Sequence, residues 1–277
     1  MEKAKFVLAN RRLEGMSLER FCYEWGVVHV ALMATSPMAV ARIRRYVQGY
    51  SLAHRFGELR LAYPLSEDAW DGFASLDYDS LESFLTSLPR RSGGRSHDFS
   101  DPKMVVEVTG EDVVIDELRA PEADAVKLVH FLRRAPGVDQ ETFASTWRTA
   151  YAPRLLEAAG GAVGRYVQNP ALSLEGSVFE GTAYGQGLFG AYGGVEELFF
   201  ESADALRRWC ADETALGRIR EAGEGLVDPA GSFSMVVTDR LRFVSALGPD
   251  GESVHCWAPP GIEIRSQLGA FGGAVAP

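Results

Sequence analysis

The sequence has few cysteines, few basic residues and no long hydrophobic run. Its 277 residues include three cysteines, without a CxxC pair and without metal-ligand spacing, so we expect a cytoplasmic protein with no metal site. No apolar stretch reaches membrane-spanning length, and the first residues lack the apolar core of a signal peptide. These absences favour a globular protein that is stabilised by its hydrophobic core.

Positive charge is scarce, since 28 Lys and Arg face 38 Asp and Glu, for a net charge of −10. Nucleic acids and anionic membranes are bound by basic surfaces, so we expect neither as a partner. The sequence contains no Gly-x-Ser-x-Gly nucleophile motif. The glycine-rich stretch 184–194 lacks the Lys-Ser/Thr pair or spaced acid of a nucleotide site. It is typical of an irregular loop or of a lid over a pocket.

The chain contains the same set of spaced residues twice. Phe21 and Trp25 recur as Phe143 and Trp147, and Arg-Tyr-Val-Gln occurs at 45–48 and again at 165–168. The offset is 122 residues through the tryptophans (147 − 25) and 120 at the second motif (165 − 45). A repeat of this length indicates a duplicated domain, and the chain is long enough for two.

Each copy shows the same order of strand and helix signals. Turn glycines and the N-cap residues Ser17 and Asp139 precede the first helix of each copy, and Ser80 and Ser202 precede the second. We predict strands at 5–10, from 45, at 73–78 and 101–108, and at 125–132, from 165, at 195–200 and 228–237. The order is β-α-β-β-α-β, the ferredoxin-like unit.

The predicted fold class is α+β. A ferredoxin-like sheet exposes one face, and two copies in one chain can bury these faces against each other as an intramolecular pseudo-dimeric α/β barrel. We place the first module at 1–116, a linker at 117–124, the second module at 125–243 and an extension at 244–277. The extension contains a hairpin-like turn at 248–251.

The repeated pattern resembles the EthD-domain branch of the dimeric α/β-barrel superfamily, with two domains at roughly 3–115 and 125–240. That superfamily includes polyketide cyclases and dehydratases, cofactor-free monooxygenases, lactone isomerases and haem-handling proteins. The resemblance implies a ligand cavity between each sheet and its helices. It places the family histidine at His29 in the first copy, whereas the second copy has Tyr151 there.

Polar residues that differ between the copies are the candidate catalytic groups. His29 continues a buried helix stripe and could be a general acid or base, or a buried histidine bonded to a carbonyl. Asp77, which replaces Phe199, could orient His29 or cap the following helix. His130 stands at the position of Leu8, and with Tyr151 it would form a proton-transfer pair if both face one cavity.

The candidate substrate-binding residues are mainly aromatic. Trp25 and Trp147 are core residues that could also line a pocket. Tyr46 and Tyr166 are shared by the copies, which is typical of residues that maintain a fold. Glu197 stands at the position of Ser75 in the repeat and is either a substrate-binding residue of the second copy or an exposed strand residue.

The resemblance, together with these residues, implies a cofactor-independent cyclase or dehydratase, of lyase or isomerase type. Its substrate would be a hydrophobic, polyketide-like or aromatic small molecule, and acid–base catalysis would take place in a buried cavity. A cofactor-free monooxygenase acting on a phenol and a non-catalytic binder of hydrophobic or haem-like ligands remain as alternatives. Because the two fused modules cover each other's exposed sheet faces, we expect a monomer.

Overall fold

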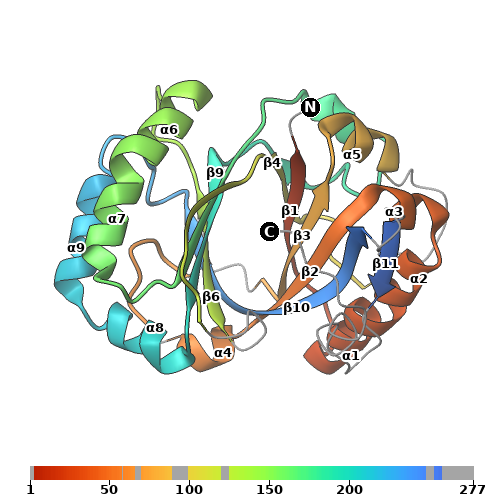
Figure 1. Ribbon diagram of the computed structural model, residues 1–277, viewed down its shortest axis with the longest axis horizontal. Helices are drawn as coiled ribbons and strands as arrows, with labels where there is room; N and C mark the ends of the chain where they lie inside the picture. Colours follow the sequence, from red (N-terminus) through yellow and green to blue (C-terminus); the bar gives the residue numbers. More distant parts are fainter. Residues whose placement is uncertain are drawn as a thin grey trace.

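A computed structural model describes residues 3–57, 59–65, 70–88, 99–119, 125–247 and 253–257. Two sheets face each other across the centre of the molecule, and each carries its helices on the outer side (Figure 1). Each sheet with its helices is called a lobe below. The predicted arrangement, two ferredoxin-like modules packed as a pseudo-dimeric barrel, is confirmed.

The first lobe contains the strands of the first sequence copy and the helices that cover them. Its strands are β1 (Ala4–Asn10), β2 (Ile43–Ser51), β3 (Gly72–Tyr78) and β4 (Val105–Thr109). Its helices are α1 (Leu18–Tyr23), a π-helical turn (Glu24–His29), α2 (Val30–Ala34), α3 (Pro37–Arg42) and α5 (Leu81–Ser87).

The second lobe follows the same order, with one helix fewer before its second strand and one helix more after its third. Its strands are β6 (Val126–Leu132), β7 (Arg165–Pro170), β9 (Gly194–Phe200) and β10 (Phe233–Leu247). Its helices are α6 (Gln140–Thr146), a π-helical turn (Trp147–Tyr151), α7 (Ala152–Ala159), α8 (Ala203–Cys210) and the additional α9 (Glu213–Ala222).

The fourth strand of each module continues into the sheet of the other module. β10 pairs with β6 through its first residues and with β2 through its later ones. After β4 the chain continues as β5 (Asp112–Asp116), which pairs with β7. The sheet order is β5-β7-β9-β6-β10-β2-β3-β1-β4-β8, with β11 (Ser253–Trp257) on β10. Pairing at both junctions joins the two four-stranded sheets into a barrel.

Apolar side chains from both sheets meet inside the barrel. Phe73 of β3 lies edge-on to Phe131 of β6, with ring centroids 6.3 Å apart, and Phe131 stacks on Phe233 at 4.6 Å. Because side chains alternate along a strand, the opposite face of each sheet packs on its helices. Each lobe thus has its own core between sheet and helices, in addition to the shared barrel interior.

The repeated residues maintain the framework. Ser17 and Asp139 cap their helices, since their side chains accept the backbone N–H of Arg20 and of Thr142. The tryptophan of each copy packs directly against the first residue of its third strand. A Cβ at Gly72 would lie 2.3 Å from the Trp25 ring, and a Cβ at Gly194 would lie 2.5 Å from the Trp147 ring. Glycine is therefore required there.

The loop between the second and third strands of each module crosses to the other lobe. In the first copy this loop carries α4 (Ala53–Phe56) and Tyr63, which belong to the core of the second lobe. In Figure 1, α4 lies beside α8. In the second copy it carries a 3-10 turn (Gly176–Phe179), Tyr184 and β8 (Leu188–Phe189), which pack on the first lobe. The space between sheet and helices in each lobe is therefore closed by a loop of the opposite copy.

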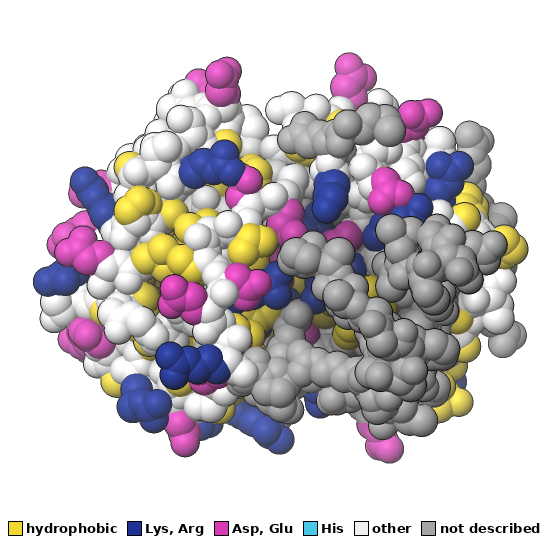
Figure 2. Space-filling view, in the orientation of Figure 1, with side chains coloured by type: hydrophobic (Ala, Val, Ile, Leu, Met, Phe, Trp, Pro, Cys, Tyr) yellow, Lys and Arg dark blue, Asp and Glu magenta, His cyan; other side chains and the backbone are white. Residues whose placement is uncertain are grey.

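The module boundaries predicted from the sequence separate elements that the fold interlocks. β5 ends the first predicted module but pairs with the second sheet, and β10 extends past residue 243 to Leu247. Residues 120–124 of the predicted linker, the predicted turn at 248–251 and residues after 257 lie outside the described residues. Figure 2 shows acidic and basic side chains interspersed on the visible face, with hydrophobic side chains gathered over the second lobe.

Candidate functional site

The first lobe encloses an apolar cavity of about 220 Å³ between its sheet and its helices. A smaller pocket of about 30 Å³ adjoins it and shares four lining residues with it, His29, Met33, Leu76 and Tyr184. Tyr46 and Trp25 line the smaller pocket. Three residues proposed from the sequence, His29, Trp25 and Tyr46, thus surround one space.

The titratable groups among the described lining residues of this cavity are one imidazole and several phenols. His29 lies edge-on to Tyr46 and Phe99, with ring centroids 6.3 and 5.5 Å apart, and is 7% exposed. Burial raises the pKa of Tyr46 and of Tyr184, and that of Tyr78 to about 12. These phenols therefore keep their protons at neutral pH, and imidazole is the group whose ordinary pKa suits a base.

A glutamine from the repeated Arg-Tyr-Val-Gln motif positions the tyrosine of each lobe. Gln48 Nε2 donates to the Tyr46 hydroxyl at 2.8 Å and to the Trp25 carbonyl at 3.0 Å. Gln168 makes the equivalent bonds to Tyr166 at 2.9 Å and to the Trp147 carbonyl at 3.2 Å. Both tryptophans lie in π-helical turns, which are frequent at functional sites.

In the second lobe, polar side chains converge on one carboxylate, Glu196. Its Oε1 lies 2.6 Å from His130 Nδ1 and accepts from the Tyr151 hydroxyl at 3.1 Å. Its Oε2 accepts from the Tyr166 hydroxyl at 2.7 Å and from Trp147 Nε1 at 3.3 Å. His130 and Tyr151, predicted as a pair if they shared a space, are brought together through this carboxylate.

The Glu196 cluster is completed from the other copy and is fully buried. Tyr63, on the crossing loop, places its hydroxyl 3.3 Å from that of Tyr151 and its ring edge-on to His130 at 5.2 Å. His130, Tyr151 and Glu196 each have 0% exposed surface. Burial, together with the charge of Glu196, raises the pKa of Tyr63, Tyr151 and Tyr166, so the phenols stay protonated donors.

Two substitutions distinguish the lobes at equivalent positions. Leu8 and Ala74 pair across β1 and β3 and both line the small pocket of the first lobe. Their counterparts His130 and Glu196 pair across β6 and β9 in the same register. A leucine and an alanine leave space beneath His29, whereas a histidine and a glutamate occupy that space in the second lobe.

Two of the predicted site residues lie on the other face of their strands. Asp77 was proposed either to orient His29 or to cap the following helix. The first is wrong, because His29 lies above the helix-covered face, and Ser80 rather than Asp77 caps the helix. On β3, Ala74, Leu76 and Tyr78 face the helices. Asp77 therefore faces the barrel interior, beside its pairing partner Lys5. Burial raises the pKa of Asp77, although the charge of Lys5 opposes this.

Glu197 was proposed as a ligand residue, with an exposed strand position as its alternative, and the structure places it at the centre of the barrel. It is 3% exposed and bridges both copies, with Oε1 2.8 Å from Lys5 Nζ and Oε2 2.7 Å from Lys127 Nζ. Burial alone would raise its pKa, but the two ammonium groups hold the pKa of Glu197 well below its usual range. Lys5 also pairs with Glu111, and Lys127 with Asp239.

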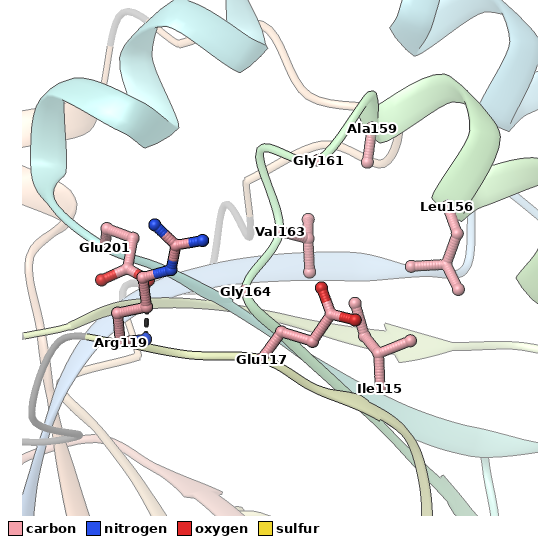
Figure 3. Close-up of a pocket in the computed structure, with 9 residues that line it drawn as sticks. All are labelled: Ile115, Glu117, Arg119, Leu156, Ala159, Gly161, Val163, Gly164 and Glu201. Atoms are coloured by element: carbon pink, nitrogen blue, oxygen red, sulfur yellow. Dashed lines mark hydrogen bonds between the residues drawn. The ribbon is translucent and has the colours of Figure 1, made fainter.

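A third pocket, of about 640 Å³, lies beside the end of α7, where the chain leaves β5. Figure 3 shows the side chains of Glu117 and Arg119 at this pocket, with Glu201 accepting the backbone N–H of Arg119 at 2.8 Å. The remaining lining is aliphatic or glycine. Because its lining includes neither an imidazole nor a phenol among the described residues, it is a poorer acid–base site than the first-lobe cavity.

Sequence reasoning missed Glu196 and Tyr63, and it placed Tyr184 only within the possible loop or lid at 184–194. Glu196 replaces Ala74 of the first copy and could have been found by the comparison that selected its neighbour Glu197. Tyr63 and Tyr184 could not, because their roles depend on loops that cross between lobes. Within the described residues, no group of three His, Cys, Asp or Glu is arranged to hold a metal ion, and no helix has the length and apolar character to cross a membrane.

Comparisons with known proteins agree with this architecture. Residues 135–230 match the family model of the EthD domain. A protein named chalcone isomerase cfoK, from Aspergillus candidus, is 26% identical, over 83% of this chain and 95% of that protein. The crystal structure of an anthrone oxidase-like protein superposes with a TM-score of 0.52 at 10% identity, covering 87% of this chain and 93% of that one. The chain therefore matches the EthD domain over residues 135–230 and has the dimeric α/β-barrel fold as a single-chain pseudo-dimer.

Proposed function

We propose that the protein is a cofactor-independent isomerase or cyclase that closes a ring in a phenolic, polyketide-like substrate by proton transfer. The observation that carries this proposal is that His29 and Tyr46 line one apolar space in the first lobe. The similarity to a protein named as a chalcone isomerase supports both the reaction type and an aromatic substrate. The apolar wall would hold a flat, hydrophobic molecule against these two polar groups.

The reaction requires one base and one hydrogen-bond donor. His29 accepts the proton of a substrate phenol, and the resulting phenolate oxygen adds to the alkene carbon that is conjugated with a ketone. The electron pair of the alkene moves onto the ketone oxygen as an enolate, and His29 returns the proton to the adjacent carbon. One C–O bond and one C–H bond form while one O–H bond and one π bond are lost. Substrate and product are therefore isomers.

Tyr46 stabilises the enolate oxygen. Its oxygen accepts a hydrogen bond from Gln48, so its own proton remains to donate into the cavity. Burial keeps the pKa of Tyr46 above its ordinary value, and a protonated phenol is the form that stabilises an oxyanion. Tyr184, contributed by the other copy, closes the same space.

The test is turnover of a 2′-hydroxychalcone, followed by loss of its enone absorption. We expect His29→Ala to lower kcat by about 10²- to 10⁴-fold, the usual contribution of a general base. Tyr46→Phe keeps the ring and should lower kcat while KM changes little. His130→Gln, in the second lobe, keeps a polar side chain beside Glu196; it is the matched control and should leave kcat within about threefold.

Removal of dissolved oxygen should not change the rate, because the isomerisation consumes no oxidant. An oxygen-dependent rate would instead identify a monooxygenase. Tight binding of the chalcone without turnover by the native protein would identify a carrier. Undiminished turnover by both His29→Ala and His29→Gln would refute the proposed base.

A further inference from the structure

A second groove of the first lobe, of about 320 Å³, lies between the π-helical turn and β10. Its polar lining includes the guanidinium groups of Arg240 and Arg242 and the hydroxyls of Tyr50 and Thr238. None of its described lining residues is an Asp or a Glu. A two-arginine groove of this kind is unusual in a chain with a net charge of −10.

The second lobe shows what fills the equivalent position. Strand register shows which residues correspond. Gln48 and Gln168 are equivalent in the sequence repeat; Arg240 pairs with Gln48 on β2, and Asp112 pairs with Gln168 on β7, so Arg240 corresponds to Asp112. The same irregularity follows in both strands, so the bulged Arg242 corresponds to the bulged Val114. The sequence repeat makes Gly26, which follows Trp25, the counterpart of Arg148.

In the second lobe, Arg148 and Asp112 form an ion pair across this position. In the first lobe, glycine stands at the place of Arg148 and an arginine stands at the place of Asp112. On the helix side the Tyr50 hydroxyl and Arg242 lie against Gly26, and on the strand side Arg240 stands where the second lobe has Asp112. Asp112 supplies a negative charge at this position in the second lobe, whereas Arg240 supplies a positive charge in the first.

Arg242 is held in position by the framework. Its Nε donates to Gln48 Oε1 at 2.9 Å and its Nη2 to the Tyr50 hydroxyl at 3.0 Å. Glycine at position 26 leaves room for the Tyr50 side chain, since a Cβ on residue 26 would lie 2.3 Å from the Tyr50 hydroxyl. These bonds use two of the five N–H donors of the guanidinium. An ordered guanidinium loses less entropy when it binds an oxyanion.

We propose that this groove binds the carboxylate or phosphate group of a small molecule, with Arg240 and Arg242 as its principal contacts. Both groups present two or more oxygens to the planar guanidinium and form charge-assisted hydrogen bonds with it. Tyr50 and Thr238 supply further hydroxyls at the same wall. The site is distinct from the apolar cavity, from which the Trp25 ring, packed on Tyr50 at 5.1 Å, separates it.

The test is calorimetric titration of the full-length protein with benzoate and, separately, with inorganic phosphate, at constant ionic strength in chloride. We expect saturable binding of at least one anion, and the stronger of the two identifies the ligand class. Arg240→Asp, which copies the residue of the second lobe, should weaken binding at least about tenfold, and Arg242→Val should do the same. Asp112→Asn, in the second lobe, is the matched control and should bind like the native protein.

Arg240 is exposed, so its replacement should leave the fold intact, which far-UV circular dichroism and the melting temperature would check. Absence of binding to the native protein, or equal binding to native protein and Arg240→Asp, would overturn the proposal. Turnover of the chalcone plays no part in this measurement. Failure of the proposed isomerase activity would therefore leave the anion site standing, and the reverse also holds.

Discussion

The two lobes share a framework and differ in what occupies the space between sheet and helices. In the first lobe, Leu8 and Ala74 leave a cavity beneath His29. In the second, His130 and Glu196 occupy the same strand positions and form a buried hydrogen-bonded cluster. At the same strand positions, one lobe therefore has a pocket and the other has internal hydrogen bonds.

Each lobe also contains a side chain from the other copy. Tyr184 of the second copy lines the first-lobe cavity, and Tyr63 of the first copy completes the second-lobe cluster. A separated module would lack the side chain that closes its own space. The second lobe therefore still contributes to the first-lobe cavity, through the crossing loop and through the shared barrel interior.

The comparison between the two lobes is tested most strongly by the contribution of the Glu196 cluster to the free energy of unfolding. Glu196→Ala removes the acceptor for His130, Tyr151, Tyr166 and Trp147, and it leaves a cavity in a fully buried position. We expect the free energy of unfolding to fall by about 3–5 kcal/mol, as when one partner of a buried charged network is removed. Urea unfolding followed by tryptophan fluorescence measures this change.

Glu213→Ala is the control, because Glu213 pairs with Arg60 at an exposed site and should contribute less than about 1 kcal/mol. Glu196→Gln keeps the side-chain volume and should have an intermediate effect. A loss of less than about 1 kcal/mol for Glu196→Ala would show that the cluster does not stabilise the second lobe.

The framework was predictable from the sequence because local rules determine it. Ser17 and Asp139 cap helices, and the paired Trp and Gly positions follow from the close approach of ring and backbone. The pairing of β5 with β7 and of β10 with β2 was not predictable. Both strands show ordinary strand patterns, and nothing local distinguishes a strand that ends a module from one that enters the other sheet.

The candidate site was predictable in part. His29, Tyr46 and the His130–Tyr151 pair were found because they interrupt apolar stripes or recur in both copies. Asp77 was misassigned because its strand face was not counted from the residues that contact the helices. Tyr184 was predicted only as part of a possible loop or lid, because a loop residue shows no periodicity and the cavity that it closes depends on the tertiary fold.

A second prediction concerns the pH dependence of stability and a carboxyl group in the barrel interior. This group, Glu107, belongs to the first module, and the second module has the apolar Met235 at the equivalent strand position. Glu107 is 1% exposed and accepts the backbone N–H of Tyr192 at 3.1 Å. Burial raises its pKa from 4.5 to about 8, although that hydrogen bond opposes the shift. The folded protein therefore holds a proton on Glu107 that the unfolded chain releases above pH 4.5.

The stabilisation from this proton is complete below pH 4.5 and is lost as the pH rises from about 4.5 to about 8. In that window we expect Glu107 to lower the free energy of unfolding by at most about 1.4 kcal/mol per pH unit. Urea unfolding at pH 5, 7 and 9 measures the slope. Glu107→Gln should remove this component, so identical slopes for the variant and the native protein would contradict the assignment.

The smallest expected effect comes from transferring the second-lobe pair into the first lobe. Leu8→His combined with Ala74→Glu places an imidazole and a carboxylate beneath His29, where the native residues line the pocket. We expect the affinity for a 2′-hydroxychalcone to fall at least about tenfold, which corresponds to about 1.4 kcal/mol. Calorimetric titration measures it without relying on turnover.

Leu8→Met combined with Ala74→Ser is the matched control, because it changes the same positions by small volumes and adds no charge. Its affinity for the chalcone should stay within about threefold of the native value. The reverse exchange, His130→Leu with Glu196→Ala, should open a cavity in the second lobe that admits a small apolar probe such as benzene. Unchanged chalcone affinity after the first exchange would mean that the ligand does not occupy the space above Leu8 and Ala74. The two substitutions would then not explain why the lobes differ.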